Sequence, residues 1–335
     1  MPHAVVRRAG VASVTDLGRP GLARYGIAAN GAADQYSAAA ANLLVGNPAP
    51  DPLIEVTGSA FELTGDVPLL VAVTGAPAEV TVAGRAQPMW QPLSVASGER
   101  VAVSVPRVGV RCYLAAYGAF AAPVVLGSSA PDRQLGVGSW LAAGVEVPLG
   151  GGYTPFDHPV ARQPLLRYAT GLRGADRFGA DRVVAVTDGP DAAEFGDTAA
   201  TLFAGEYTVT PAADHVGLRL AGPRPSTTGP PERLSRGVPV GAVEVPPGPE
   251  LIVLRRGRPV TAGYPVVAVV TRVAQSTVGQ LGPGDRVRFR HSSLADAVAE
   301  HRRERAELAE LAGRVRTVFD RLGLPCRLAT VEVPR

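Results

Sequence analysis

Polar side chains interleaved with glycines make residues 15–47 the stretch of this chain where chemistry is most expected. Arg19 offers a planar guanidinium, which can bind a carboxylate or a phosphate through two parallel hydrogen bonds. Asp34 offers a carboxylate that can contact a ligand or cap the helix that follows it. Asn30 and Gly31 lie between them, and glycine lets backbone donors approach a ligand closely. This pattern predicts a ligand-facing loop.

Three more polar residues follow in the first half of the chain. Asn42 lies in the predicted helix Tyr36–Leu44, among alanines and leucines, so a buried amide there must either tie down the loop or contact substrate. Asn47 precedes a proline and favours turn chemistry. Glu55 is a carboxylate among apolar residues, and it needs a partner such as Arg19 or a position facing a cleft.

The second half offers a weaker set of candidates. Asp214 stands beside His215, where it can tune the imidazole or simply belong to a solvated loop. Arg219 follows on a predicted strand, opposite in direction to its apolar neighbours. Thr261 and Tyr264 precede an apolar strand, and Tyr264 is held stiffly between Gly and Pro with a hydroxyl that can reach a cleft.

Two series of short alternating segments must position these residues. One spans 53–150 and the other about 181–290, each punctuated by Gly and Pro in the manner of a barrel or sandwich. The expected strands are Ala60–Thr64, Leu69–Val73, Ala78–Val82, Val101–Val105, Val108–Leu114, Arg182–Val186, Tyr207–Val209, Gly217–Leu220, Leu251–Leu254, Val266–Thr271 and Arg286–Phe289. The turn and strand at Leu141–Val147 recur at Leu281–Val287, which indicates a duplicated unit or a chance echo.

The predicted organisation is a first domain at 1–150, a second at 151–290 and a C-terminal helix at 291–323. The Gly- and Pro-rich residues 150–167 read as the linker. The helix is rich in Ala, Glu, Leu and Arg, and it carries an apolar stripe made of Leu308, Leu311, Val315, Val318 and Leu322. That stripe either packs on its own barrel, which we favour, or contacts a second protein chain.

Composition excludes several functions. The chain has 335 residues and no lysine, so a P-loop lysine, a Schiff-base lysine and a biotinylated lysine are all excluded. The net charge of +3 is small and scattered, which argues against nucleic-acid binding. Cys112 and Cys326 form neither a zinc pattern nor a disulfide framework, and we predict no metal site. The sequence shows no signal-peptide or membrane-spanning run, so a cytoplasmic protein is expected.

The motifs of the first stretch, taken in order, resemble a family signature. Asp16–Gly21, Gly26-Ile27, Gly31–Asp34 and Ala41–Asn47 are similar to the carboxyltransferase-domain A/B family, which includes allophanate hydrolase subunit 2, KipA-like proteins and the C-type subunits of 5-oxoprolinase. The resemblance covers roughly the first nine-tenths of the chain. Its later pieces are Leu53–Glu55, Tyr113–Ala115, Leu126–Ser128, Asp132, Gly241–Pro246, Gly263–Pro265 and Gly282–Asp285.

This resemblance implies a mainly β fold of two tandem cyclophilin-like open β-barrels. It implies ATP-dependent opening of 5-oxoproline to glutamate, with a KipI-like subunit and a LamB/YcsF-like subunit as partners and ATP at a site that can be shared with them. Two alternatives stay open: carboxyl transfer from carboxybiotin on another protein, as in urea carboxylase, and a non-catalytic KipI-binding role. We predict catalytic roles for Arg19, Asp34, Glu55 and Tyr264, and substrate contacts for Asn30, Gly31, Asn42, Thr261 and Arg219.

The second half departs from the family pattern at three places. Asp214-His215 replace the Asn-Arg that the family commonly has, and Glu244 replaces the glutamine of its Gln-Val-Pro. The residues 256–265 replace Asn-Asp-x-Gln-Thr-Thr-Gly-Gly-Tyr-Pro and lose its Asp and Gln. The first-half signature is intact, so the departures predict either an altered substrate or partly lost activity.

Overall fold

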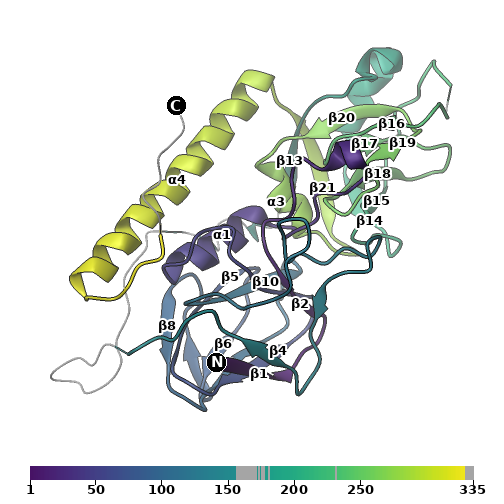
Figure 1. Cartoon of the computed structure of the whole chain (residues 1–335). Helices are drawn as coiled ribbons and strands as arrows, with labels where there is room; N and C mark the ends of the chain where they lie inside the picture. Colours follow the sequence, from purple (N-terminus) through teal and green to yellow (C-terminus); the bar gives the residue numbers. More distant parts are fainter. Residues whose placement is uncertain (156–171, 173, 175–177, 180–181, 231, 329–335) are drawn as a thin grey trace. The chain divides into compact units, whose positions relative to one another are not determined.

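The computed structural model describes residues 1–155, 172, 174, 178–179, 182–230 and 232–328 (Figure 1). The chain forms two compact units, and each is assembled from separate segments. Unit 1 contains Met1–Gly18, Gln35–Phe178 and Arg305–Arg335, and unit 2 contains Arg19–Asp34 and Gly179–Glu304. The ranges predicted from sequence were contiguous, whereas here the signature loop groups with the second half of the chain. From residue 156 on, the predicted linker lies outside the described residues.

The described part of unit 1 contains two antiparallel six-stranded sheets. The first has the order β12 (Glu146–Pro148), β1 (His3–Arg8), β4 (Phe61–Gly65), β9 (Arg100–Val103), β6 (Val80–Val82), β7 (Arg85–Gln87). The second has the order β11 (Ser139–Trp140), β2 (Ala12–Thr15), β3 (Leu53–Thr57), β10 (Arg111–Ala116), β5 (Leu69–Gly75), β8 (Pro92–Val95). The alternating apolar segments of the sequence therefore do form strands, and the prediction of a mainly β fold is confirmed.

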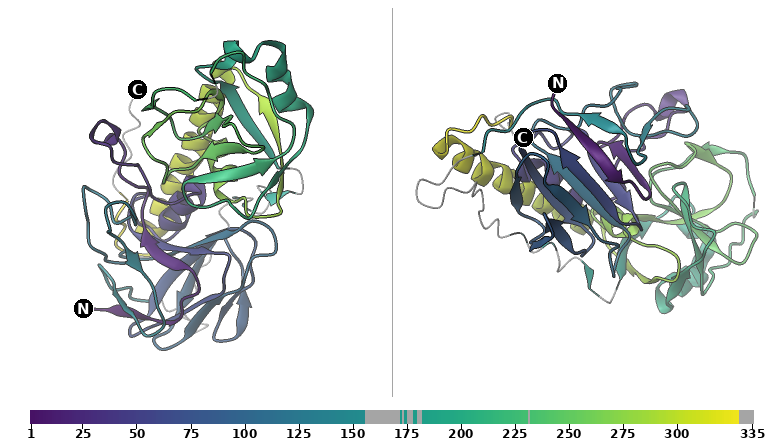
Figure 2. Two further views of the ribbon diagram at one scale, coloured as in Figure 1. Left: turned by 90° about the vertical axis from the view of Figure 1, so that its right-hand side faces the viewer. Right: turned by 90° about the horizontal axis from the view of Figure 1, so that it is seen from below.

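Helix α1 (Gln35–Leu44) packs against β5 and β10 of the second sheet (Figures 1 and 2). All of its residues from Tyr36 onward are buried. Its run of alanines has almost no side-chain bulk, so the helix can lie close to the sheet, and the Thr74 hydroxyl donates to the Ser37 carbonyl at 2.7 Å. Every residue of β5 is buried, because it lies in the interior of this layer.

Unit 2 is a closed seven-stranded barrel. Its order is β13 (Val183–Asp188), β20 (Val266–Val270), β17 (Ala242–Glu244), β18 (Leu251–Leu254), β15 (Gly217–Ala221), β14 (Tyr207–Val209), β21 (Arg286–His291). Parallel pairing of β13 with β21 joins the first and last strands, so this barrel is closed rather than open as the resemblance implied. Short elements complete the unit: η1 (Ala23–Tyr25), η3 (Ala192–Ala200), α2 (Thr201–Ala204), α3 (Ala274–Gly279), and a ribbon of β16 (Arg236–Gly237) and β19 (Thr261–Ala262).

The sequence echo between the two halves corresponds to a repeated local structure. Near Gly144, the Val6 N–H donates to the Val145 carbonyl at 2.9 Å and Gly144 donates back to Val6 at 2.8 Å. Near Gly284, Val209 and Asp285 reproduce the first bond at 2.9 Å, and Gly284 donates to Val209 at 2.8 Å. Both glycines have a φ near +87°, namely 86° and 87°, which a side chain would disfavour. The duplicated turn is thus a structural feature of both units.

Helix α4 (Leu294–Arg321) follows the barrel, and its residues from Arg305 onward belong to unit 1. Its buried side chains are Leu311, Ala312, Val315 and Phe319, so the stripe predicted from sequence runs through Phe319 rather than through Val318 and Leu322. Phe319 packs on Gly46, where an added Cβ would lie 2.6 Å from the ring. These contacts show that the C-terminal half of the helix packs on its own chain.

Candidate functional site

A buried carboxylate fixes the backbone where the signature motif begins. Asp16 accepts hydrogen bonds from the Gly18 N–H at 2.7 Å and the Ser128 hydroxyl at 2.6 Å. Its second oxygen accepts from the Ser129 N–H at 2.7 Å. Two motif pieces more than a hundred residues apart therefore meet within unit 1, and Asp16 serves to order the chain leading into the loop.

The signature loop, residues Arg19–Asp34, is anchored inside unit 2 by the connector after β18. Asn30 donates its N–H to the Arg256 carbonyl at 3.2 Å, and its own carbonyl accepts from Arg256 Nε at 2.7 Å. Asn30 has a φ of +46°, a conformation that asparagine tolerates better than most residues. A Cβ on Gly257 would lie 2.9 Å from the His215 carbonyl, so glycine is needed for this close approach. Arg19 is only 2% exposed and donates its N–H to the Ala29 carbonyl at 2.8 Å.

The other end of the loop is held by the C-terminal end of α3. The Asp34 carboxylate is 2% exposed and accepts a hydrogen bond from Gln280 Nε2 at 2.9 Å. A Cβ on Gly279 would lie 2.4 Å from the Ala33 carbonyl, so only glycine lets α3 come this close. A cavity of about 20 Å³ beside Ala33 has room for about one water, so a substrate must reach the loop from another side.

A second polar cluster lies on the outer side of the unit 2 barrel. Arg219, Ile252, Glu244 and Val266 are neighbours in register across β15, β18, β17 and β20, and we call these four residues the barrel face. Glu244 is 2% exposed, and no described residue donates a hydrogen bond to its Oε1. Burial raises the pKa of Glu244 to about 7, while the positive charge of Arg219 opposes that rise. The barrel face therefore contains a carboxyl group that can change protonation near neutral pH.

The ribbon of β16 and β19 belongs to the apolar layer over the barrel face. Val238, Ala262 and Tyr264 cluster with Ile252 and Val266. Thr261 lies in the same ribbon but is exposed. Three residues that the sequence suggested, Arg219, Thr261 and Tyr264, are thus on or beside one surface of unit 2.

Ion pairs fasten the ribbon to the barrel. Asp191 accepts from Arg233 Nη1 at 3.0 Å, from Arg236, and from the Val266 N–H at 2.8 Å. Burial opposes ionisation of Asp191, but the hydrogen bonds and charges of these arginines outweigh it and lower its pKa. Arg233 also pairs with Glu194 at 2.6 Å. No sequence pattern pointed to this network, because its members are separated by about 40 residues and have no common motif.

Glu55 and Asn42 have well-defined partners within unit 1. Glu55 accepts from the Tyr113 hydroxyl at 2.8 Å and pairs with Arg111 Nε at 3.5 Å, both on the neighbouring strand β10. Asn42 donates to the carbonyls of Ala49 at 3.2 Å and Asp51 at 2.7 Å. Asn42 also accepts from Asn47 Nδ2 at 3.3 Å, so these amides tie together the turn that ends α1. Catalytic or substrate roles for Glu55 and Asn42 stay predictions.

The contacts of Asn42 predict a structural cost. Asn42→Ala should lower the free energy of unfolding by about 2 kcal/mol, because two backbone carbonyls lose their donor. Urea unfolding of the full chain measures this, with Gln134→Ala at an exposed position as the control. Unchanged stability together with weaker substrate binding would instead assign Asn42 to the substrate.

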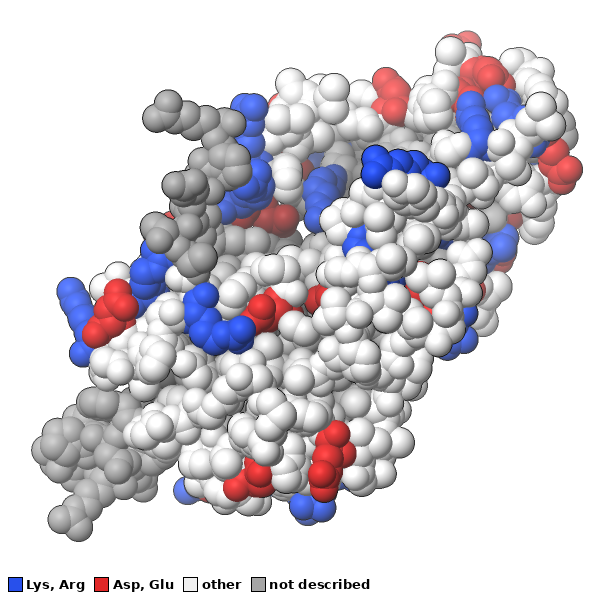
Figure 3. Space-filling model, in the orientation of Figure 1, with Lys and Arg blue, Asp and Glu red and all other residues white. Residues whose placement is uncertain are grey.

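Charged side chains of both signs are scattered over the face drawn in Figure 3, and much of that face is uncharged. Any attraction for a ligand on this face must therefore be local. Among the described residues, no group of three or more His, Cys, Asp or Glu is arranged to hold a metal ion. None of the described helices is both long and apolar enough to span a bilayer.

Residues 25–291 match the sequence model of the family "Carboxyltransferase domain, subdomain A and B". The chain therefore belongs to the carboxyltransferase-domain A/B family, as its motifs indicated. It is 27% identical over 316 residues to the C-type subunit of 5-oxoprolinase from Escherichia coli (strain K12), and the match covers 93% of this chain and 98% of that protein. It is 26% identical over 303 residues to a putative urea carboxylase of Emericella nidulans, covering 84% of this chain and 23% of that protein.

Solved structures support the same architecture. The crystal structure of TTHA0988 superposes with a TM-score of 0.75 and 30% identity, over 87% of this chain and 56% of that chain. The Kluyveromyces lactis urea amidolyase superposes with a TM-score of 0.80 over 92% of this chain and 20% of that chain. At 24% identity, the latter is evidence for the fold alone.

Proposed function

We propose that this chain is a C-type subunit of an ATP-dependent 5-oxoprolinase, which opens 5-oxoproline to glutamate. One observation carries the proposal: the match to the Escherichia coli 5-oxoprolinase subunit spans 98% of that protein, whereas the match to the urea carboxylase spans 23% of its length. A stand-alone subunit of the same extent is the simplest explanation of the first match. The intact signature loop supports it.

In this proposal the signature loop recognises the substrate. 5-Oxoproline carries a carboxylate and a lactam, so it needs a cationic donor together with acceptors for the lactam N–H. Arg19 binds the carboxylate or the oxygen that becomes negative, because a guanidinium donates two hydrogen bonds in one plane. Asp34, which Gln280 holds in place, orients the lactam, while Asn30 and Gly31 position the backbone around it. Tyr264, Thr261 and Arg219 on or beside the barrel face act as further substrate contacts.

The residues of this chain do not fit a triphosphate cradle. The sequence has no lysine and no Walker motif. Arg255 donates to the carbonyls of Val278 and Leu281, and Arg258 donates to the carbonyl of Val238, so these buried arginines serve the backbone. The proposal therefore assigns ATP, which activates the lactam carbonyl, to a partner of the KipI-like or LamB/YcsF-like type.

The family match keeps a second function under consideration. The model that matches is a carboxyltransferase domain, and the Emericella nidulans relative is a putative urea carboxylase. In that case the chain would move a carboxyl group from biotin carried by another protein, since it has no lysine to carry biotin itself. A biotin-dependent exchange reaction with urea, insensitive to 5-oxoproline, would favour this alternative.

The dependence on partners gives a direct test. The isolated chain should show no 5-oxoproline-dependent ATP hydrolysis, because it lacks a nucleotide motif. Co-expressed with a KipI-like subunit, it should elute with that subunit as one complex in size-exclusion chromatography. Steady turnover by the purified chain alone would contradict the proposal, and so would separate elution at micromolar concentration.

A further inference from the structure

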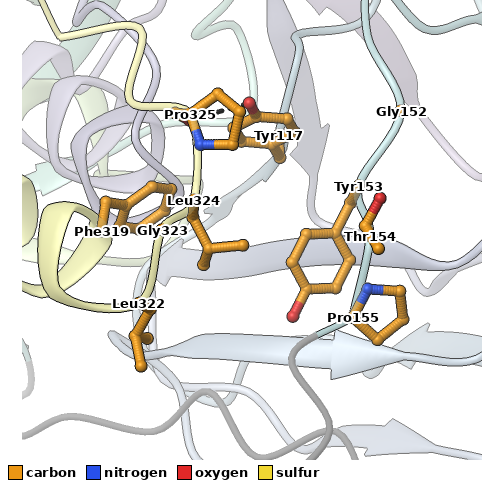
Figure 4. Close-up of a pocket in the computed structure, with 10 residues that line it drawn as sticks. All are labelled: Tyr117, Gly152, Tyr153, Thr154, Pro155, Phe319, Leu322, Gly323, Leu324 and Pro325. Carbon is orange, nitrogen blue, oxygen red and sulfur yellow. Dashed lines mark hydrogen bonds between the residues drawn. The ribbon is translucent and has the colours of Figure 1, made fainter.

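An aromatic cavity in unit 1 lies beyond the end of α4. Its volume is about 320 Å³, which is within the range of ordinary small-molecule sites. It is lined by Tyr117, Gly152, Tyr153, Thr154, Pro155, Phe319, Leu322, Gly323, Leu324 and Pro325 (Figure 4). None of these ten residues is charged, and none belongs to the signature loop or to the barrel face.

Three aromatic rings give the cavity its character. The rings of Tyr117 and Phe319 have their centroids 6.3 Å apart, and those of Tyr117 and Tyr153 are also 6.3 Å apart with nearly edge-on geometry at 60°. Phe319 and Tyr153 are buried, so packing holds their rings in place. Leu324 and Tyr153 face one another in Figure 4, with Leu322 and Pro155 completing the lining below them. Such walls suit another flat ring.

Hydrogen bonds hold the wall formed by residues 322–325. The Leu324 N–H donates to the Phe319 carbonyl at 2.9 Å, and the Tyr117 hydroxyl donates to the Pro325 carbonyl at 2.8 Å. Just beyond, Arg327 donates its N–H to the Gly46 carbonyl at 3.1 Å and pairs with Asp51 at 2.8 Å. The wall is therefore fastened at both ends, which makes the cavity a preformed one.

The polar groups of the cavity restrict its ligand. A charged ligand would lose its hydration without meeting a counter-charge among the lining residues. The Tyr153 hydroxyl receives only a long bond of 3.4 Å from Ser94, so its own O–H can donate to a ligand acceptor. An apolar cavity of ~150 Å³ already holds a benzene-sized molecule, so this larger one has room for a ring with a substituent.

We propose that this cavity is a binding site for an uncharged compound with one aromatic ring and one hydrogen-bond acceptor. The ring lies among Tyr117, Tyr153 and Phe319, and the Tyr153 hydroxyl donates to the acceptor. This site is separate from the proposed 5-oxoprolinase function and does not depend on it.

The test uses the full chain with acetophenone as the probe and benzoate as its charged counterpart, both followed by ligand-observed NMR titration. Acetophenone should bind saturably, and benzoate at least about tenfold more weakly because its charge finds no partner. Tyr153→Phe keeps the ring but removes the donor, so it should weaken acetophenone binding about fivefold. Leu324→Trp, which fills the cavity, should abolish binding, while Leu234→Trp at an exposed position should leave it unchanged.

Thermal unfolding of each variant identifies any loss of fold. If Leu324→Trp does not fold, Thr154→Trp fills the cavity from its exposed rim instead. The proposal is overturned if wild-type protein shows no saturable binding, if benzoate binds as well as acetophenone, or if a folded cavity-filling variant binds acetophenone as the wild type does.

Discussion

Arg19→Lys should lower the turnover of the reconstituted complex almost as much as Arg19→Ala, by about a hundredfold or ~3 kcal/mol of transition-state stabilisation. Lysine keeps the charge but loses the two-pronged geometry that binds a carboxylate or an oxyanion in one plane. Arg19 is suited to such a role because its backbone is fixed by the Ala29 carbonyl and its side chain is almost fully buried. Steady-state kinetics with 5-oxoproline measures the effect.

The matched control is Arg286→Lys, since Arg286 is an exposed arginine in the same unit and should tolerate the change. Full turnover in Arg19→Ala would reject the catalytic role. If Arg19 instead only ties down the loop, Arg19→Ala should lose turnover together with a large drop in melting temperature and in partner affinity. Thermal unfolding of both Arg19 variants therefore accompanies the kinetics.

Glu244→Gln should make the protein more stable above neutral pH and change little under acid conditions. The pKa of this carboxyl rises from 4.5 to about 7 in the folded state, because burial disfavours its charge. Folded protein then binds the proton more tightly than unfolded protein does. The resulting stability is fully present below pH 4.5 and is lost as the pH rises to about 7. The loss amounts to about 3 kcal/mol, and glutamine removes it.

Urea unfolding at pH 4.5 and pH 8 measures this difference. At pH 8 the Glu244→Gln variant should be up to about 3 kcal/mol more stable than the wild type, and at pH 4.5 the two should be nearly equal. Glu232→Gln, at an exposed position, should follow the wild type at both pH values. Equal stability of Glu244→Gln and wild type at pH 8 would contradict the buried-carboxylate account.

Local pattern predicted most strands of this fold. Tyr207–Val209 and Leu251–Leu254 were expected as strands with the bounds that β14 and β18 have, because alternating apolar residues end there at turn-forming residues. The closure of the barrel could not be predicted in the same way. It depends on β13 pairing with β21, which starts about a hundred residues later, and nothing in either strand encodes its partner.

The candidate site divides along the same line. Arg19, Asn30, Gly31 and Asp34 were found because they lie within one short motif. The residues that hold them, Arg256 and Gln280, come from the far half of the chain and carry no motif of their own. Glu244 was noticed only as a departure from the family pattern. Its burial and its raised pKa depend on neighbours across three strands, which the sequence does not reveal.

Product analysis of the complex formed with its KipI-like and LamB/YcsF-like partners tests the central proposal most directly. Glutamate release and ATP consumption should be measured with 5-oxoproline, urea and allophanate in parallel. The proposed function predicts ATP consumption coupled to glutamate formation from 5-oxoproline, with no coupled turnover of the other two, and loss of that activity when this chain is omitted. A complex that processes urea or allophanate but leaves 5-oxoproline intact would contradict it.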